Sequence, residues 1–174
     1  DGRAAMTEHK ELLARISREY QVAPQYIVAL WGIETNYGKN TGGFSTISAL
    51  ATLAYEGRRR DFFRDELIKT LRIEQEDGFR ASEIKGSWAG ALGQCQFMPS
   101  SFLNFAVDYN KDGKRDIWGT QEDVFASIAN YLHEVGWNNS DSIDEKHKIL
   151  KKWNRSTYFV TAVTKIAHGI APQK

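Results

Sequence analysis

The chain has 174 residues, of which 41% are hydrophobic and 26% are charged, a composition typical of a folded domain and not of a disordered chain. Its 23 Lys and Arg residues nearly balance its 22 Asp and Glu residues, which argues against a partner bound mainly by charge, such as nucleic acid. No apolar run approaches the roughly 20 residues of a membrane span. The single cysteine, Cys95, excludes both an internal disulfide framework and a cysteine zinc cluster.

The first half of the chain is predicted to be helical. Apolar residues recur at spacings of three and four, and only 3 Pro are present. A first helix is expected over residues 7–20. Pro24 suits the first turn of a second helix, which ends before Gly38. Two further helices are expected, over residues 46–55 and 61–76.

The second half begins with a segment rich in Gly and Ala, residues 86–96, where the backbone can closely approach another backbone or a ligand. A helix then runs from Pro99 through Phe105. Three later helices are predicted by the same spacing rules. The first follows a capping box made by Thr120 and Asp123 and runs toward Gly136, the second carries residues 149–153, and the last is capped by Ser156 or Thr157.

Glu34 is the first candidate for chemistry, because it lies near the end of the second predicted helix. Its neighbours three or four positions away are Leu30, Trp31 and Tyr37, so its carboxyl group is expected to face apolar and aromatic surface. Burial and the negative end of the helix dipole both disfavour the charged form and raise the pKa, as a general acid requires. The alternative is an ordinary solvated glutamate at a helix end.

Residues 108–114 have the pattern of the opening half of a calcium-binding loop. Oxygen-bearing side chains occupy alternate positions, a glycine is sixth, and a backbone carbonyl is available at the seventh position. These positions are Asp108, Asn110, Asp112, Gly113 and Lys114. The twelfth position is Gly119 and not a bidentate Glu, so closure would need Glu122 or Asp123. The alternative is an acidic surface turn.

Aromatic residues are frequent, with 5 Trp, 7 Tyr and 9 Phe. Aromatic rings can stack on sugar rings, and amides such as Gln94, Gln96 and Asn154 can bind hydroxyl and acetamido groups. Most of these rings are nevertheless expected in the core. The four histidines show no metal-ligand spacing, and the sequence offers neither a Ser-His-Asp arrangement nor a phosphate-binding glycine loop.

Several segments, taken in order along the chain, resemble the lytic murein transglycosylase B family. They are residues 31–38 (WGIETNYG), 90–101 (GALGQCQFMPSS), 107–118, 130–131 and 153–156. The resemblance implies a mainly α, lysozyme-like fold with an EF-hand-like calcium loop. It also implies one catalytic domain over residues 1–174, in which the family's insertion is shortened or missing around residues 138–148.

The resemblance further implies a reaction on the glycan strands of bacterial peptidoglycan. Glu34 matches the family's catalytic acid, which protonates the oxygen that links N-acetylmuramic acid (MurNAc) to N-acetylglucosamine (GlcNAc). The same group then takes a proton from the C6 hydroxyl, so that a 1,6-anhydro ring forms without water. This scheme needs a single carboxyl group, unlike that of most glycosidases.

By the same resemblance, further residues are assigned to substrate and metal. The substrate-binding set is Ser87, Gln96, Tyr131, Tyr158, Asn154, Arg58 and Arg59, and either Tyr158 or Phe159 faces the cleft. The calcium set is Asp108, Asn110, Asp112, the carbonyl of Lys114 and, in preference to Glu122, Asp123. No cofactor is expected for the chemistry, and the calcium ion is expected to be structural.

Alternative functions remain open from the sequence. They are a muramidase that cleaves the same bond with water, and a non-catalytic, calcium-stabilised peptidoglycan-binding module. We expect a monomer without nucleic-acid partner or membrane span, located in the bacterial periplasm or cell envelope. Because the sequence opens at Asp1 without a leader, we expect a mature or trimmed product, with a lipid anchor possible only in a longer form. Cys95 is interpreted as a small core filler in preference to an oxidation-sensitive thiol.

Overall fold

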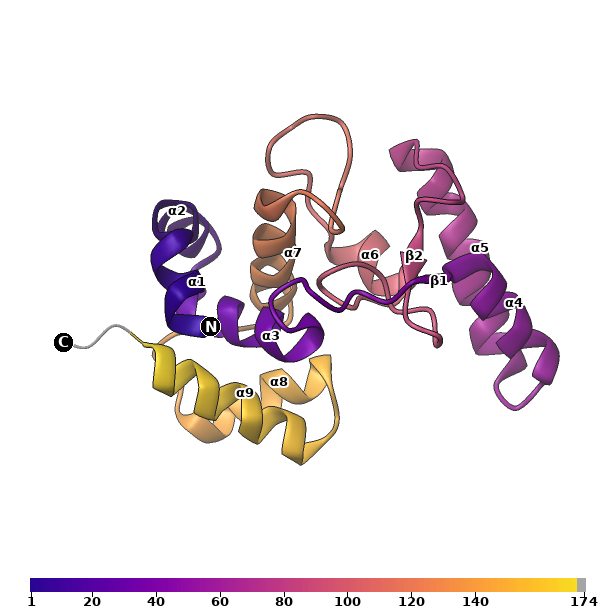
Figure 1. Ribbon diagram of the computed structural model, residues 1–174. Coiled ribbons are helices and arrows are strands. Elements are labelled where there is room, and N and C mark those ends of the chain that lie inside the picture. Colours follow the sequence, from indigo (N-terminus) through magenta and orange to yellow (C-terminus); the bar gives the residue numbers. More distant parts are fainter. Residues whose placement is uncertain (172–174) are drawn as a thin grey trace.

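Helices dominate residues 1–171, the part of the chain that the computed structural model describes (Figure 1). Their bounds are α1 Gly2–Glu8, α2 Lys10–Tyr20, α3 Pro24–Thr35, α4 Thr46–Glu56, α5 Arg60–Asp77, α6 Pro99–Phe105, α7 Gln121–Glu134, α8 Ile143–Trp153 and α9 Thr157–Ile170. Two short antiparallel strands, β1 (Phe44–Ser45) and β2 (Lys85–Gly86), pair Phe44 with Gly86. The prediction of a mainly α fold is therefore confirmed.

One predicted boundary is wrong for an identifiable reason. The single helix expected over residues 7–20 is interrupted at His9, whose imidazole ring packs edge-on against Trp31 and Phe125 at centroid distances of 5.8 and 5.1 Å. Helix α8 carries Ile149, Leu150 and Trp153 as predicted, and it begins at Ile143, inside the polar stretch 138–148. Ser142 and Glu145 form a capping box there, which fixes this start.

The capping box predicted at Thr120 is not formed. The Thr120 hydroxyl donates to Asp116, and both carboxylate oxygens of Asp123 accept backbone N–H groups from the preceding loop, from Tyr109 and Asp116. These loop contacts compete successfully with the local cap. At α9, Ser156 is the capping residue, because its side chain accepts from the Phe159 N–H.

Helix α3 lies at the centre of the core and packs against α9, α7 and α1. Its apolar stretch is buried on almost every side from Tyr26 through Trp31. Such a helix is positioned by burial of apolar surface and not by a single exposed face. Its last turn, which carries Glu34, is thereby held in a defined place. Within residues 1–171, none of the helices combines the length and apolar character needed to cross a membrane.

Helices α4 and α5 pack against each other as a helical hairpin at the side of the molecule opposite α1 and α2 (Figure 1). Two buried carboxylates attach this hairpin to the rest of the chain. Glu66 accepts from the Ser100 N–H at the start of α6 (2.8 Å). Asp77 accepts from the side chain of Arg115 through both oxygens, at 2.8 and 2.7 Å.

Candidate active site

Glu34 lies in the last turn of α3, one residue before the helix ends at Thr35. The backbone then reverses through two consecutive left-handed residues, Asn36 (φ 50°) and Tyr37 (φ 59°). The Glu34 side chain is half-buried, and its Oε1 accepts a hydrogen bond of 2.7 Å from the indole N–H of Trp153, at the end of α8. A contact between residues 119 positions apart therefore completes the surroundings of this acid.

Burial raises the pKa of Glu34 from 4.5 to about 7, and the Trp153 hydrogen bond acts in the opposite direction. Within the described part of the chain, no neighbouring carboxylate contributes to this shift. A closely spaced carboxylate pair, such as the pair about 5–5.5 Å apart in retaining glycosidases, is therefore not the source of the raised pKa. The site has the properties of a single acid that can give and retake a proton near neutral pH.

The sequence predicts the burial of Glu34 but misses its main partner. Leu30 and Trp31 on the same helix are indeed buried, yet the Trp31 indole donates to Gln94 and not to Glu34 (2.7 Å). The missed residue is Trp153, which belongs to the recognised 153–156 segment but was not assigned to the site. The sequence feature that could have pointed to Trp153 is its indole N–H, which requires a hydrogen-bond acceptor when it is partly buried.

A cavity of about 120 Å³ is lined by Trp153 and by two of the predicted substrate-binding residues, Gln96 and Tyr131. The Gln96 backbone is left-handed (φ 51°). Its amide nitrogen donates to the carbonyls of Thr41 (3.1 Å) and Gly93 (3.0 Å). Because these bonds use the amide N–H groups, Gln96 has a carbonyl oxygen left to accept from a ligand.

Tyr131 is only 8% exposed, and its surroundings are those of a buried residue. Its hydroxyl donates to the Lys152 carbonyl (2.7 Å). Its ring packs on Trp153 with a centroid distance of 4.6 Å and on Phe105 with one of 4.5 Å. Tyr131 therefore contacts the end of α8, where Trp153 is located.

Three other predicted substrate-binding residues lie in the loops that follow β2 and α8, and at the start of α9. The Ser87 hydroxyl oxygen accepts from the backbone N–H groups of Ala89 and Ala91, which shapes the loop after β2. Asn154 accepts from the Ser156 N–H and shapes the turn into α9. Tyr158 is 91% exposed. Phe159, the other candidate at this position, packs against the core, so Tyr158 is the residue accessible to a ligand.

The structure does not bring Arg58 and Arg59 to Glu34. Both are exposed and lie in the connection between α4 and α5, at the end of the hairpin away from the core (Figure 1). The Arg59 guanidinium stacks on the ring of Phe62, 4.0 Å from its centroid. A role for this pair requires a ligand long enough to extend from the Glu34 site along the hairpin.

The predicted calcium loop is held together by its own side chains. Asp108 accepts from the backbone N–H groups of Asp112 (3.1 Å) and Gly113 (2.8 Å), and Asp112 accepts from that of Lys114 (3.0 Å). Gly113 is left-handed (φ 95°), as the sixth position of such a loop requires. Among residues 1–171, no three His, Cys, Asp or Glu side chains gather closely enough to hold a metal ion.

The donors that this loop offers are consequently mixed oxygens and not a carboxylate cluster. They are two aspartates, one asparagine and one backbone carbonyl. Asp123 is fully buried, and burial raises its pKa to about 6, although it accepts backbone N–H groups from the loop. Such an all-oxygen set fits a hard cation such as calcium and does not fit a transition metal.

Cys95 is fully buried, and its thiol contacts the Val124 carbonyl at 3.5 Å. Burial raises its pKa well above the usual value, so the thiol stays protonated and is a poor nucleophile. These surroundings agree with its interpretation as a core filler.

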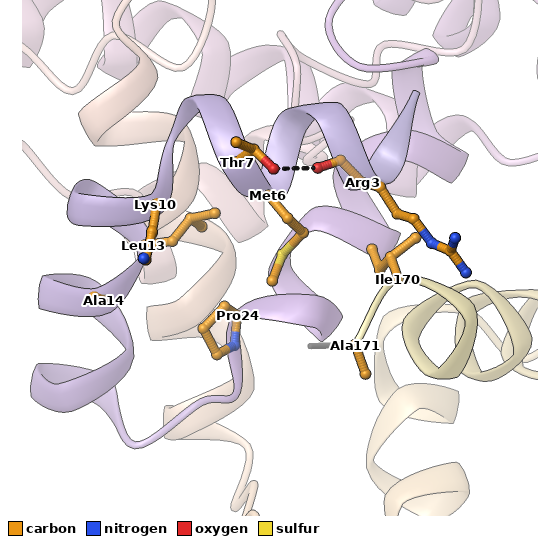
Figure 2. A pocket seen from close by; sticks show the side chains of 9 residues that line it. All are labelled: Arg3, Met6, Thr7, Lys10, Leu13, Ala14, Pro24, Ile170 and Ala171. Carbon is orange, nitrogen blue, oxygen red and sulfur yellow. Dashed lines mark hydrogen bonds between the residues drawn. The ribbon is translucent and has the colours of Figure 1, made fainter. Parts of the chain in front are cut away.

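A larger cavity, of about 590 Å³, lies away from Glu34 between α1, α2, the start of α3 and the end of α9 (Figure 2). Its walls are mostly apolar, with Met6, Leu13 and Ile170 among them, and its charged members are Arg3 and Lys10. Among residues 1–171, those that line this cavity include no carboxyl group that could act as a general acid. Glu34 is therefore the stronger candidate for acid chemistry.

Known proteins resemble this chain in sequence and in fold. A family model described as the transglycosylase SLT domain matches residues 1–146. The membrane-bound lytic murein transglycosylase B of Escherichia coli (strain K12) is 36% identical over 137 residues, which are 78% of this chain and 38% of that protein. The chain thus spans well under half the length of this curated relative.

Solved structures show the same fold. SltB3 from Pseudomonas aeruginosa in complex with NAG-anhNAM-pentapeptide matches with a TM-score of 0.92 and 30% identity, over 97% of this chain and 62% of that one. The lytic transglycosylase Slt35 of Escherichia coli in complex with calcium matches with a TM-score of 0.90 and 25% identity, over 97% and 72%. Together with the family match over most of its length, these similarities show that the chain belongs to the transglycosylase SLT domain family.

Proposed function

We propose that this chain is a peptidoglycan lytic transglycosylase that cleaves the MurNAc-β-1,4-GlcNAc bond and leaves a 1,6-anhydroMurNAc end. The observation that carries the proposal is the half-buried carboxyl group of Glu34, with a pKa near 7, whose hydrogen-bond partner Trp153 lines a cavity together with Gln96. Membership of the family supports the reaction class, and the fragment named in the SltB3 complex, NAG-anhNAM-pentapeptide, contains an anhydro sugar.

In the first half of the reaction, Glu34 is the general acid. Because its pKa is raised to about 7, a large fraction of the carboxyl groups is protonated at neutral pH. The carboxyl donates its proton to the oxygen between the two sugars. The bond from MurNAc C1 to this oxygen breaks, its electron pair stays with the oxygen, and GlcNAc leaves with a free 4-hydroxyl. The 2-acetamido group of MurNAc stabilises the electron-poor C1.

In the second half, Glu34 is the general base. Its carboxylate takes the proton of the MurNAc C6 hydroxyl while the C6 oxygen bonds to C1. The acid recovers the proton that it gave, and no water is consumed. The absence of a neighbouring carboxylate from the causes of the Glu34 shift, among the described residues, agrees with a scheme that uses one acid twice.

The remaining substrate contacts follow from which polar atoms are free. The Gln96 carbonyl oxygen is suited to accept from an acetamido N–H or a sugar hydroxyl, since its amide nitrogen is already bonded. Ser87 and Asn154 are proposed as polar contacts, and the exposed ring of Tyr158 as a stacking surface. Arg58 and Arg59, at the end of the hairpin, suit the carboxylates of a peptide stem.

The domain boundary and the location complete the proposal. Residues 1–174 are proposed to act as one catalytic domain, in which the family's insertion is shortened or missing around residues 138–148. Hydrogen bonds hold the start of this segment in place. Lys146 donates to the Asn139 and Asp141 carbonyls, and the Trp137 indole donates to Asn139. The periplasm or cell envelope of a bacterium is proposed as its place of action, in line with the name of the membrane-bound relative.

Calcium is proposed as a structural ion in the loop from Asp108 to Lys114. The side-chain oxygens of Asp108, Asn110 and Asp112 and the Lys114 carbonyl would hold it, with Asp123 closing the site from α7. Bound there, the ion would cross-link the loop and contribute to stability, not to bond cleavage. A structural relative in complex with calcium supports this proposal.

The proposal is tested by the products formed from purified sacculi. We expect the unmodified chain to release muropeptides with anhydroMurNAc ends, which mass spectrometry separates from hydrolysis products by the mass of one water. The substitution Glu34→Gln should abolish release while sacculus binding persists, because the amide keeps the shape of the carboxyl but cannot donate its proton. Glu11→Gln, the same change on the exposed face of α2, is the control.

Two results would overturn this assignment. Products that carry an added water would identify a muramidase. An unmodified chain that binds sacculi and never releases fragments would identify a binding module. Folding of each variant is checked by its thermal midpoint, so that loss of release is not confused with unfolding.

A further inference from the structure

The Trp153 indole is held in one orientation. Its ring packs on Tyr131 at a centroid distance of 4.6 Å with an interplanar angle of 62°, and on Phe97 at 5.3 Å. The Tyr131 hydroxyl donates to the carbonyl of Lys152, the residue before Trp153 (2.7 Å). The backbone next to Trp153 is also held by a hydrogen bond, in which the Asn154 N–H donates to the Leu150 carbonyl (3.0 Å). Contacts on its ring and on its backbone therefore restrict the direction of the indole N–H.

This N–H donates to only one of the two oxygens of Glu34. Oε1 accepts it at 2.7 Å, whereas Oε2 takes no hydrogen bond within residues 1–171. In a protonated carboxyl group, the oxygen without the proton is the better acceptor. The indole N–H consequently favours the form in which Oε1 accepts and the proton resides on Oε2.

We propose that Trp153 is a positioning residue that holds the proton of Glu34 on Oε2, and that Tyr131 acts by supporting Trp153. The proposal rests on the proposed role of Glu34 as the acid and base of the reaction. When Glu34 has given up its proton, the indole N–H on Oε1 becomes a charge-assisted hydrogen bond and stabilises the carboxylate. Oε2 then remains available to take the C6 proton, so the same oxygen serves both halves of the reaction.

This interpretation changes the role of Tyr131. The family resemblance places it among the substrate contacts, but its hydroxyl is bonded to Lys152 and its ring faces Trp153 and Phe105. With 8% of its surface exposed, it has little area left for a sugar. Its contribution is accordingly expected in the rate of cleavage and not in the affinity for glycan.

The decisive variant is Trp153→Phe, which keeps a ring in place and removes the N–H. We expect kcat to fall about 10- to 100-fold, the effect expected when one hydrogen bond to a charged group is lost. KM should change less than about 3-fold, since uniform binding of substrate is not affected. The alkaline limb of the pH profile should move to higher pH, because the Trp153 bond lowers the pKa of Glu34.

A matched control is available in the same chain. The Trp137 indole also donates to a side-chain oxygen, that of Asn139 (2.9 Å), in the connection between α7 and α8. Trp137→Phe removes an equivalent N–H there, and we expect kcat and the pH profile to stay as in the unmodified chain. Tyr131→Phe should lower kcat with KM nearly unchanged. A rise in KM alone would instead make Tyr131 a substrate contact and overturn its supporting role.

A measurement without turnover separates this proposal from the proposed function. The indole ¹H–¹⁵N resonance of Trp153, assigned by its loss in Trp153→Phe, should titrate with a midpoint near pH 7. It should stop titrating in Glu34→Gln. Titration without anhydro products would refute the transglycosylase function and leave the hydrogen bond established. Anhydro products with an indole that does not titrate, or a Trp153→Phe variant with normal kcat and pH profile, would refute the positioning role.

Discussion

At the scale of single residues, Glu34 has a carboxyl group whose burial costs stability. Its pKa is about 7 in the folded chain, whereas the ordinary value of 4.5 applies to the unfolded chain, where the group is not buried. The folded state therefore binds more protons than the unfolded state between these pH values. The contribution of Glu34 to the free energy of unfolding is most favourable below pH 4.5 and is lost as the pH rises through 7.

This linkage predicts that Glu34→Gln stabilises the chain at alkaline pH. At pH 8 the free energy of unfolding should rise by up to about 3 kcal/mol, because the amide is not charged and still accepts from Trp153. At about pH 3, which lies below both pKa values, the carboxyl is protonated in both states and the two chains should be nearly equal. Urea unfolding at both pH values measures the difference, and equal stability at pH 8 would contradict the buried-acid description.

The sequence was informative about Glu34 and much less so about its surroundings. Its place near a helix end among apolar neighbours, together with the 31–38 segment, was sufficient to single it out. The hydrogen bond from Trp153 could not be predicted, because it joins residues 119 positions apart and depends on how α8 packs against α3. Local spacing contains no information about such a pairing.

At the scale of elements, the helical hairpin α4–α5 depends on Glu66. This residue is 2% exposed, and its carboxylate accepts from the Ser100 N–H in the first turn of α6. An acidic group at a helix N-terminus satisfies an otherwise unpaired donor and interacts favourably with the helix dipole. Glu66 thereby joins the middle of α5 to the start of α6.

We expect Glu66→Ala to lower the free energy of unfolding by about 1–3 kcal/mol, because it leaves the partly buried Ser100 N–H without its acceptor. Asp65→Ala, one residue earlier on the exposed face, should change it by less than about 0.5 kcal/mol. Urea unfolding compares the two variants. An effect of Glu66→Ala no larger than that of Asp65→Ala would show that this contact does not hold the hairpin.

Helix ends were predicted correctly where a single local rule applied and incorrectly where a contact with another part of the chain competed with that rule. Pro24 and Pro99 begin α3 and α6 as expected, because proline suits a first turn. At Thr120, by contrast, the local capping rule failed because the Asp123 carboxylate accepts from the backbone N–H groups of Tyr109 and Asp116 and not from that of Thr120. The interruption at His9 depends on tertiary packing, which periodicity does not contain.

At the scale of the whole molecule, the proposed calcium ion predicts a response in thermal stability. A ligand that binds only the folded state at about 100 times its Kd adds about 2.7 kcal/mol. For a chain of this size that corresponds to a rise in Tm of about 5–10 °C. Calorimetry with calcium and with a chelator measures the shift, and a double substitution of Asp108 and Asp112 by Asn should abolish it. An unmodified chain whose Tm ignores both additions would rule out the site.

The overall architecture followed from the sequence, because the apolar spacing of the helices and the order of the family segments agree with each other. The loop from Asp108 to Lys114 did not follow as fully. Its side chains bond to their own backbone, and this arrangement serves an acidic turn and a cation site alike. The number of oxygens alone cannot distinguish the two.

The pairing of Glu34 with Trp153 also has a consequence for the stage of synthesis at which the proposed activity develops. As the ribosome makes the chain, residue 34 emerges long before residue 153, and domains generally fold as units once their parts are present. Until α8 has docked, the glutamate lacks both its indole partner and part of its burial, and it behaves as an ordinary acid that is ionised at neutral pH. A form in which α8 has not yet packed therefore lacks an acid that is protonated at neutral pH at this position, and we expect the proposed activity to develop only after α8 is in place.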